Sequence, residues 1–525
     1  MAGRSLKRVK RLLVVLTLVV GALGLLHVLV SAWAVHALKE RIHDAAAKAG
    51  AEWSTPDRTA ITLDLLAGDV SITDLRWSPL ADADPSVLTA SGHLDSVIVR
   101  GLSYSSILFR DRVAADRFAL FGSDAHITLP RDSSQERSKG SELIGIRLGN
   151  VQLHLQNSRV TLADSTNVSL TDLVVNGAAL KVDLQDPDVS AASFTATALG
   201  LRADPFADSV LVIDGIAFDG VTGELSIHGI AFGPSDVVER AKTVVVERDV
   251  IAGSLQRLEF HGMDVDALLK GVVSFRSVHV GPARLAVARD KVLRDPPFEH
   301  KPLPAHLLRA LPVGTGTDSV TMERLKVDYY ERVDVGRGFA HIPFDSISCS
   351  LVNVHHVAED TLFVKATGFL FDHTPLALDL RAHIGDSTDL IVVDANVGRL
   401  AFPQLNKVLT KLTGVAIPEG RLDTMILRMN GRDRQANARC WMRYDGLKLD
   451  RRMDKNRALD PVFNGLLNAV VKRGRTGEKD GQGWESYAWD RRRDRALFNY
   501  LWAGVREGAK TSMLPKAVVD QVSKK

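Results

Sequence analysis

Apolar and polar side chains alternate in short runs through most of the chain after residue 67, and Gly, Asp, Asn and Pro separate the runs. Because successive side chains of a β-strand point to opposite faces, this alternation predicts strands. One run, from Gly68 to Pro79, has four such apolar residues, namely Val70, Ile72, Leu75 and Trp77. A one-residue shift at Asp74 separates the two pairs, as is typical of a β-bulge or a tight bend. The pattern therefore predicts a mainly β fold.

The same run returns later in the chain. Residues Gly223 to Pro234 match it position by position, with apolar residues at Leu225, Ile227, Ile230 and Phe232. A second sequence motif follows this run in both places. Its aligned residues are Leu94, Val97, Val99, Gly101, Leu102, Ile107 and Leu108 in one copy and Leu255, Leu258, Phe260, Gly262, Met263, Leu268 and Leu269 in the other. Two sequence motifs that recur in the same order indicate an internal repeat. Repeats that cannot bury their own apolar face stack on their neighbours, which predicts an elongated, repetitive antiparallel β-sheet.

Two stretches interrupt this alternation of apolar and polar residues. Four prolines between residues 296 and 304, followed by an apolar helical pattern, predict a Pro-rich break with a short helix. Strands resume afterwards, with one short helix predicted over residues 402–412. Beyond Leu449 the alternation stops, and residues 460–472 and 490–510 have helical patterns. The β body is therefore expected to end in C-terminal helices.

The N-terminus has a different pattern. The segment from Leu12 to Val35 contains no charged residue, and as a helix it would be about 36 Å long, enough to cross a bilayer. Five Lys and Arg residues precede it without any acidic residue, so the N-terminus is expected in the cytoplasm and the body outside it. Ala32-Trp33-Ala34 also fits a signal-peptide cleavage site, although the apolar stretch is long for one. Both alternatives export the body.

These patterns divide the chain into eight regions. They are a basic cytoplasmic tail (1–11), a transmembrane helix (12–35), a connecting helix and linker (36–66), a first β-repeat region (67–222), a second β-repeat region (223–295), the Pro-rich break (296–316), a C-terminal β region (317–450) and a basic, aromatic helical tail (451–525).

The amino-acid composition excludes only a few classes of protein. Charged residues are 25% and hydrophobic residues 45% of the 525, which is ordinary for a globular protein. The net charge of +3 does not favour nucleic acid as a partner, and neither does export. The two cysteines, Cys349 and Cys440, exclude a disulfide-dense scaffold. They could pair in an oxidising compartment, but separate buried thiols are favoured.

No enzyme motif stands out from the rest of the sequence. The G-x-S-x-G, H-E-x-x-H and G-x-x-x-x-G-K-[ST] patterns are missing from it. His355 and His356 are adjacent, so on a strand they would face opposite sides and could not easily share one metal ion. The sequence therefore predicts no catalytic residue, no metal site and no cofactor.

The C-terminal tail combines aromatic and basic residues. From Arg451 to Lys525 there are 17 Lys and Arg against 9 Asp and Glu. Rings and cations together suit the headgroup region of a membrane. The candidates for such contacts are Trp484, Trp489, Arg491, Arg492, Arg493 and Trp502. The alternative, which is slightly favoured, is a helix packed on the open end of the sheet with solvated arginines.

A basic N-terminus, a single span and many short strands together resemble the AsmA-like family of bacterial envelope proteins. The segments Ile417–Leu422, Cys440–Leu449 and Phe498–Trp502 look like the C-terminal part of that family. The resemblance implies a sheet curled into a groove with an apolar inner face. It also implies a periplasmic body, anchored in the inner membrane through Leu12 to Val35, that moves phospholipid towards the outer membrane or supports outer-membrane homeostasis.

We therefore expect a non-enzymatic protein whose partners are membrane phospholipid and other envelope proteins. The residues expected to line a lipid groove are Val70, Ile72, Leu75, Trp77, Leu225, Ile227, Ile230 and Phe232. The alternative for all eight is an ordinary closed core, in an exported scaffolding protein that binds other envelope proteins.

Overall fold

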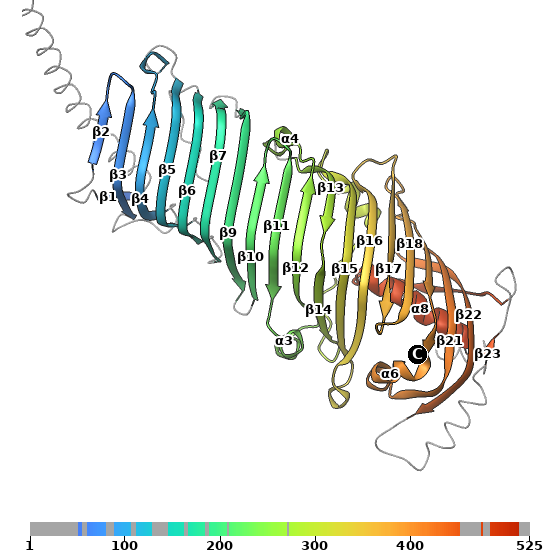
Figure 1. Ribbon diagram of the computed structural model, residues 1–525. Coiled ribbons are helices and arrows are strands. Elements are labelled where there is room, and N and C mark those ends of the chain that lie inside the picture. The colour runs from blue at the N-terminus through green and yellow to red at the C-terminus, as the bar shows by residue number, and fades with distance from the viewer. Residues whose placement is uncertain are drawn as a thin grey trace, which may run out of the picture. The chain divides into compact units, whose positions relative to one another are not determined.

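The structure is a computed structural model that describes residues 51–54, 60–79, 89–106, 112–128, 145–161, 166–183, 188–206, 209–269, 272–451, 474–475 and 483–513 (Figure 1). The segment from Leu12 to Val35 lies outside these residues, as does the helix predicted over 460–472. Within the described part of the chain, no helix is long and apolar enough to cross a bilayer. The fold is mainly β, as the alternation predicted.

The chain forms two compact units. Unit 1 comprises Met1–Ala207 and Val212–Val221, and unit 2 comprises Asp208–Leu211 and Thr222–Lys525. The strands of unit 1 are β1 (Ala51–Ser54), β2 (Ala60–Asp64), β3 (Asp69–Pro79), β4 (Thr89–Arg100), β5 (Arg112–Thr128), β6 (Gly145–Thr161), β7 (Asn167–Asp183), β8 (Asp188–Ser190), β9 (Ser193–Phe206) and β10 (Ser209–Asp219), the last of which begins in the segment assigned to unit 2. From β3 onward most strands pair with the next along the chain, and β7 pairs with both β8 and β9.

Unit 2 repeats this order and adds helices. Its strands are β11 (Glu224–Gly233), β12 (Asp249–His261), β13 (Ser274–Val280), β14 (Ala283–Asp290), β15 (Gly316–Arg332), β16 (Ala340–His355), β17 (Thr361–Leu370), β18 (Thr374–His383), β19 (Ile391–Val397), β20 (Leu400–Ala401), β21 (Val415–Gly431), β22 (Gln435–Arg451), β23 (Gly474–Arg475) and β24 (Glu485–Asp490). Its helices are α3 (Val237–Thr243), α4 (Val265–Leu269), α5 (Pro304–Arg309), η1 (Val335–Arg337), η2 (Phe402–Leu405), α6 (Asn406–Thr413) and α8 (Leu497–Met513).

The predicted helices over 402–412 and after the prolines are present as η2 with α6 and as α5. One expectation was wrong in detail. The pattern over residues 490–510 forms a helix only from Leu497, because residues 491–496 form a turn that follows the end of strand β24 at Asp490. The sequence also did not indicate α3, whose first turn is capped by the Asp236 side chain.

The two repeats have the same hairpin register. In unit 1, Ile72 of β3 pairs with Val97 and Leu75 pairs with Leu94. In unit 2 the aligned residues pair in the same way, since Ile227 faces Leu258 and Ile230 faces Leu255. The phrases that were aligned in the sequence are therefore structurally equivalent hairpins.

The turn that enters each hairpin explains two of the repeated glycines. Gly68 and Gly223 have φ angles of 72° and 66°, a region that side chains with a Cβ rarely adopt. Their carbonyl oxygens accept hydrogen bonds from the backbone N–H of Leu102 and Met263, at 2.9 and 2.8 Å. A Cβ on either glycine would lie within 2.7 Å of the oxygen of that same partner residue. Only glycine fits both the angle and the contact.

The sheet is not antiparallel throughout. β5 runs parallel to β6, and β13 and β14 run parallel to β15, at equivalent points of the two repeats. A parallel pair needs a long connection that brings the chain back to the same end of the sheet. Residues 291–315 supply this connection between β14 and β15, whereas the segment between β5 and β6 lies outside the described residues. Alternation along a strand does not encode the direction of its neighbour, so the antiparallel prediction was wrong at these junctions.

In unit 2, the helices cover one face of the sheet only where its last strands lie. Leu308 of α5, Leu303 at the N-cap of that helix and Tyr500 of α8 pack in one core. Their partners in the sheet are Leu380, Val393 and Met429. Phe402 of η2 and Val408 of α6 belong to two neighbouring cores on the same face. In contrast, α3 packs on the other face, against Val250 and Ala288.

Candidate functional site

Apolar side chains form three rows across six strands of unit 1. Cross-strand partners lie on the same face of a sheet, so each row is read directly from the pairing. The rows are Val70, Val99, Phe118, Val151, Gly177 and Phe194; Ile72, Val97, Leu120, Leu153, Val175 and Ala196; and Leu75, Leu94, Gly122, Leu155, Leu173 and Ala198. We call this surface the apolar face of unit 1. It runs over β3, β4, β5, β6, β7 and β9.

The other side of the same strands is more polar. The row next to the first one contains Ser71, Ile98, Ala119, Gln152, Asn176 and Thr195. Polar groups such as Gln152, which accepts a hydrogen bond from Arg117, are suited to water. The sheet of unit 1 is therefore amphipathic, with one apolar side.

No second layer covers the apolar face among the described residues of unit 1. Among the described elements of unit 1, the strands pack closely only with other strands of the sheet, and no described helix packs on the face. Ile72 is 8% exposed, but most of its neighbours in the rows are only half-buried. An apolar sheet face normally packs against a second layer, and large exposed apolar patches usually mark a binding surface. The face is therefore the strongest candidate site of the molecule.

The predicted groove residues lie together in two sets. In unit 1, Val70, Ile72 and Leu75 belong to the apolar face, and the backbone of Trp77 continues it opposite Gly92. In unit 2, Leu225, Ile227 and Ile230 are half-buried on one face of the hairpin, and Phe232, on the same face, is 39% exposed. The structure thus joins each set on one face of a sheet.

The six proposed membrane contacts do not form one exposed surface. Trp489 packs in the core with Tyr500, and the ring of Trp484 lies under the guanidinium groups of Arg428 and Arg439. Trp502 is 41% exposed on α8. Aromatic residues in the sequence looked interfacial because their spacing does not reveal which of them the fold buries.

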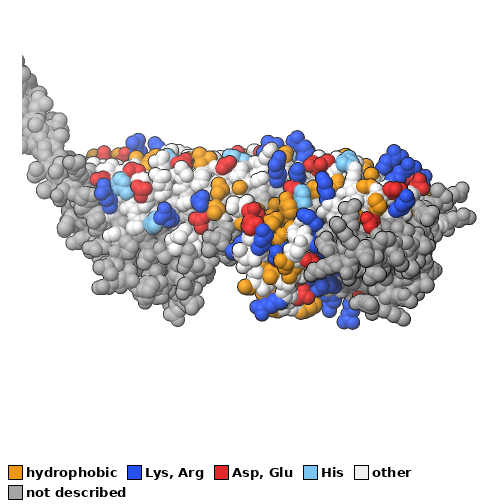
Figure 2. Space-filling model, turned by 90° about the horizontal axis from the view of Figure 1, so that it is seen from below, with side chains coloured by type: hydrophobic (Ala, Val, Ile, Leu, Met, Phe, Trp, Pro, Cys, Tyr) orange, Lys and Arg blue, Asp and Glu red, His pale blue; other side chains and the backbone are white. Residues whose placement is uncertain are grey.

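The three arginines among the proposed membrane contacts form ion pairs with acidic residues of the same chain. Arg491 is buried, and its guanidinium lies 2.8 Å from Asp433, which Arg493 also contacts at 2.7 Å. Arg492 remains more than half exposed and pairs with Asp494. Basic and acidic side chains lie beside one another along much of the side shown in Figure 2. Because Arg491 is buried, its guanidinium is not available to a membrane headgroup. Trp489 is half-buried against Tyr500, and membrane contact through the other candidates stays a prediction.

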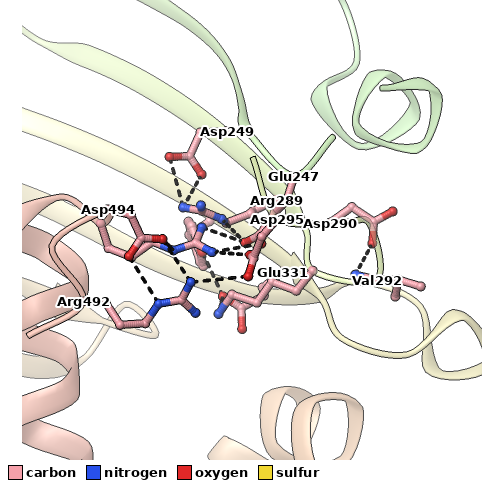
Figure 3. Close-up of polar contacts among 12 residues, drawn as sticks. Glu247, Asp249, Arg289, Asp290, Val292, Asp295, Glu331, Arg492 and Asp494 are labelled. Carbon is pink, nitrogen blue, oxygen red and sulfur yellow. Dashed lines mark hydrogen bonds and ion pairs between the residues drawn. The ribbon is translucent and has the colours of Figure 1, made fainter. Parts of the chain in front are cut away.

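A buried ionic cluster, which the sequence did not indicate, holds the start of α8 in place (Figure 3). Arg495 and Glu247 are each 4% exposed at their side chains and form two contacts of 2.9 and 3.0 Å. Arg289 of β14 also donates to Glu247, at 2.7 Å, and lies 3.2 Å from Asp249. Burial raises the pKa of the Asp249 carboxyl. The cluster links residues 248 positions apart, so only the fold could reveal it.

Cys349 and Cys440 are not joined by a disulfide, as was favoured from the sequence. They lie on the same face of unit 2. Cys440 is fully buried beneath Gly508 of α8, whereas Cys349 is only half-buried. Burial raises the pKa of the Cys349 thiol.

This contrast gives a prediction for thiol labelling. A maleimide should label Cys349 slowly near pH 7 and faster as the pH rises, because the thiolate is the reactive form. Cys440 should stay unlabelled in the folded protein. Replacing Gly508 by leucine should make Cys440 reactive, because even a Cβ there would lie 2.5 Å from the Tyr487 hydroxyl and 3.1 Å from the Cys440 Cβ. Mass spectrometry of labelled peptides measures both sites; equal labelling of both thiols in the unmodified protein would contradict the placement of α8.

Comparison with known proteins identifies no relative. No family model matches the chain, and no curated protein matches it significantly. The resemblance to AsmA-like proteins therefore stays a prediction from the sequence pattern.

Proposed function

We propose that the protein binds membrane phospholipid through its acyl chains on the apolar face of unit 1. The observation that supports this proposal is the set of three apolar rows, six strands wide, that no described element of unit 1 covers. The lipid would lie along the rows, across the strands.

The chemistry of a sheet face favours hydrocarbon over a peptide. Backbone N–H and C=O groups of the inner strands are already bonded in the ladders, so the face offers no row of hydrogen-bonding groups to a peptide. It offers apolar contact alone. Removing one methylene group from water contributes about 0.8 kcal/mol, so an acyl chain gains from each contact without losing a hydrogen bond.

The remainder of the proposal concerns location. We propose that Leu12 to Val35 anchors the chain in the inner membrane of a bacterium and that the body lies in the periplasm. There it would carry phospholipid towards the outer membrane or support outer-membrane homeostasis, along a sheet curled into a groove. The resemblance to AsmA-like proteins and the apolar N-terminal segment support this part, and other envelope proteins are proposed as partners.

Neighbouring residues of β7 provide a matched test. A photo-crosslinking amino acid at Val175, on the apolar face, should form an adduct with phospholipid during purification in mild detergent. The same amino acid at Asn176, exposed on the opposite face, should form at least about tenfold less, because successive side chains of a strand point to opposite sides. Mass spectrometry identifies the adducts. Equal labelling at the two positions, or no co-purifying phospholipid, would exclude lipid binding on this face.

A scaffolding function is the second candidate. The closed cores beneath α5, α6 and α8 favour it for the last strands of unit 2, where the apolar face is filled by the protein itself. If scaffolding is the whole function, deletion of the gene should leave outer-membrane lipid asymmetry and detergent resistance intact.

A further inference from the structure

The apolar face of unit 2 continues without interruption beneath the C-terminal helices. One row runs from Phe260 through Val278, Val320, Leu351, Val364, Leu380, Val393 and Met429 to Ala438. A second row lies beside the first. In order, it consists of Ile227, Leu258, Val280, Met322, Cys349, Ala366, Leu378, Ala395, Leu427 and Cys440. The same face is therefore apolar on every strand of unit 2 that these two rows cross.

What changes along these rows is their burial. Phe260, Val278 and Val320 are half-buried, and no described helix packs on this face at β11–β14. From Leu380 onward the exposed fraction falls to 2% at Leu380, 1% at Val393 and 2% at Met429. The face thus has an open part at β11–β14 and a closed part at β18–β22.

Helix α8 closes the face. Tyr500, Leu501 and Val505 pack into the core above β18–β22, and the Tyr487 hydroxyl donates to the carbonyl of Gly504 at 2.7 Å. The first turn of α8 reaches two further apolar rows of this face, which lie farther along the strands. One runs from Phe232 through Gly253, Leu285, Val327 and Phe344 to Leu370, and the other from Ile251 through Val287 and Tyr329 to Ile342. Their exposed fractions fall from 39% at Phe232 and 43% at Ile251 to 8% at both Leu370 and Ile342. There the ring of Phe498 lies 6.2 Å from the ring of Tyr329 and 6.1 Å from that of Phe344, and 53% of Phe498 remains exposed.

We infer that α8 ends an acyl-chain site on unit 2, with Phe498 as the stop residue at the border between the open and the closed strands. The inference rests on the proposed function. A phospholipid chain lies over β11–β14, along the rows that begin at Phe232 and Ile251, and meets the Phe498 ring when it extends towards β15. It cannot continue, because these rows are already closed at Ile342 and Leu370, which pack in one core with Val408 of α6.

The contacts that hold α8 on the sheet indicate that the helix stays in place when lipid binds. The buried pair of Arg495 and Glu247 holds the segment just before its first turn, and the close contacts of Gly504 and Gly508 hold its later turns against β22 and β24. Displacing the helix would break this buried pair and leave a desolvated charge without its partner, so α8 is held by more than apolar contact. Lipid is therefore not expected to displace the helix.

A photoreactive phospholipid tests the inference. We would incubate the full chain in mild detergent with a phospholipid carrying a diazirine at the end of one acyl chain, irradiate it, and map the adducts on peptides. Adducts are expected on β11–β14 and on the peptide with Phe498, and none on β18, β19, β21 or β22. Adducts on those closed strands would overturn the inference. Adducts on neither unit's apolar face would instead overturn the proposed function.

A matched pair of variants tests the role of Phe498. Phe498→Ala should raise the share of adducts on Tyr329 and Phe344 at least about twofold, because the ring that covers them is gone. Arg506→Ala, on an exposed position of the same helix, should leave the map unchanged. Both positions are exposed, so the fold should tolerate the changes. An unchanged map for Phe498→Ala would show that Phe498 is not the stop.

Discussion

Replacing Leu153 by glutamate is expected to remove at least about nine tenths of the phospholipid bound to unit 1. Leu153 lies in the middle row of the apolar face, between Leu120 and Val175. A carboxylate there would be buried beneath an acyl chain without a partner, which costs more than about 2 kcal/mol. Since about 1.4 kcal/mol corresponds to a factor of ten in affinity, the loss should exceed tenfold. The yield of phospholipid adduct on a photo-crosslinking residue at Val175, measured by mass spectrometry, reports this loss separately from lipid on unit 2.

The neighbouring residue supplies the control. Gln152→Glu places the same charge one residue away on the opposite face, where the new carboxylate can still accept from Arg117. It should leave bound phospholipid unchanged. Because no described element packs on Leu153, the L153E variant should also keep its β circular-dichroism signal. Full lipid content in L153E would mean that the acyl chains bind elsewhere.

Replacing Arg495 by alanine should destabilise the C-terminal part of unit 2 by about 3–5 kcal/mol. Glu247 would keep Arg289 as a partner but lose two contacts from Arg495, while both side chains lie in a buried site. Removal of Arg495 leaves the buried Glu247 carboxylate with Arg289 alone, so its charge is only partly compensated, and the cost is still far larger than for a surface pair. A lower urea midpoint and the appearance of Cys440 labelling under native conditions would report the loss of α8.

Arg492→Ala is the matched comparison for R495A. Its side chain is 56% exposed and pairs with Asp494, so the change should cost less than about 1 kcal/mol and leave Cys440 protected. If R495A and R492A had equal effects, the buried cluster in Figure 3 would not be what holds α8 on the sheet.

The hairpins were predictable because their signals are local. Period-two alternation places Val70, Ile72 and Leu75 on one face once the extra residue at Asp74 is allowed for, and Asp74 indeed has a positive φ of 54°. The glycines that begin each copy are required by their own backbone angles and by one close contact. Such features depend on a few consecutive residues, so the repeat and the face of each strand could be identified before any coordinates.

The sequence by itself therefore determined a mainly β chain, its repeat and the apolar rows, because these follow from spacing along the backbone. Only the tertiary structure decided which rows are covered. Leu153 and Leu380 are both alternating apolar residues, yet α8 and α5 pack near the second while no described element packs on the first. Burial of Arg491 and Arg495 was likewise decided by partners far away in the sequence, Asp433 and Glu247. Contacts between distant segments leave no period in the sequence, and we propose the candidate site where no described element makes such contacts with the face.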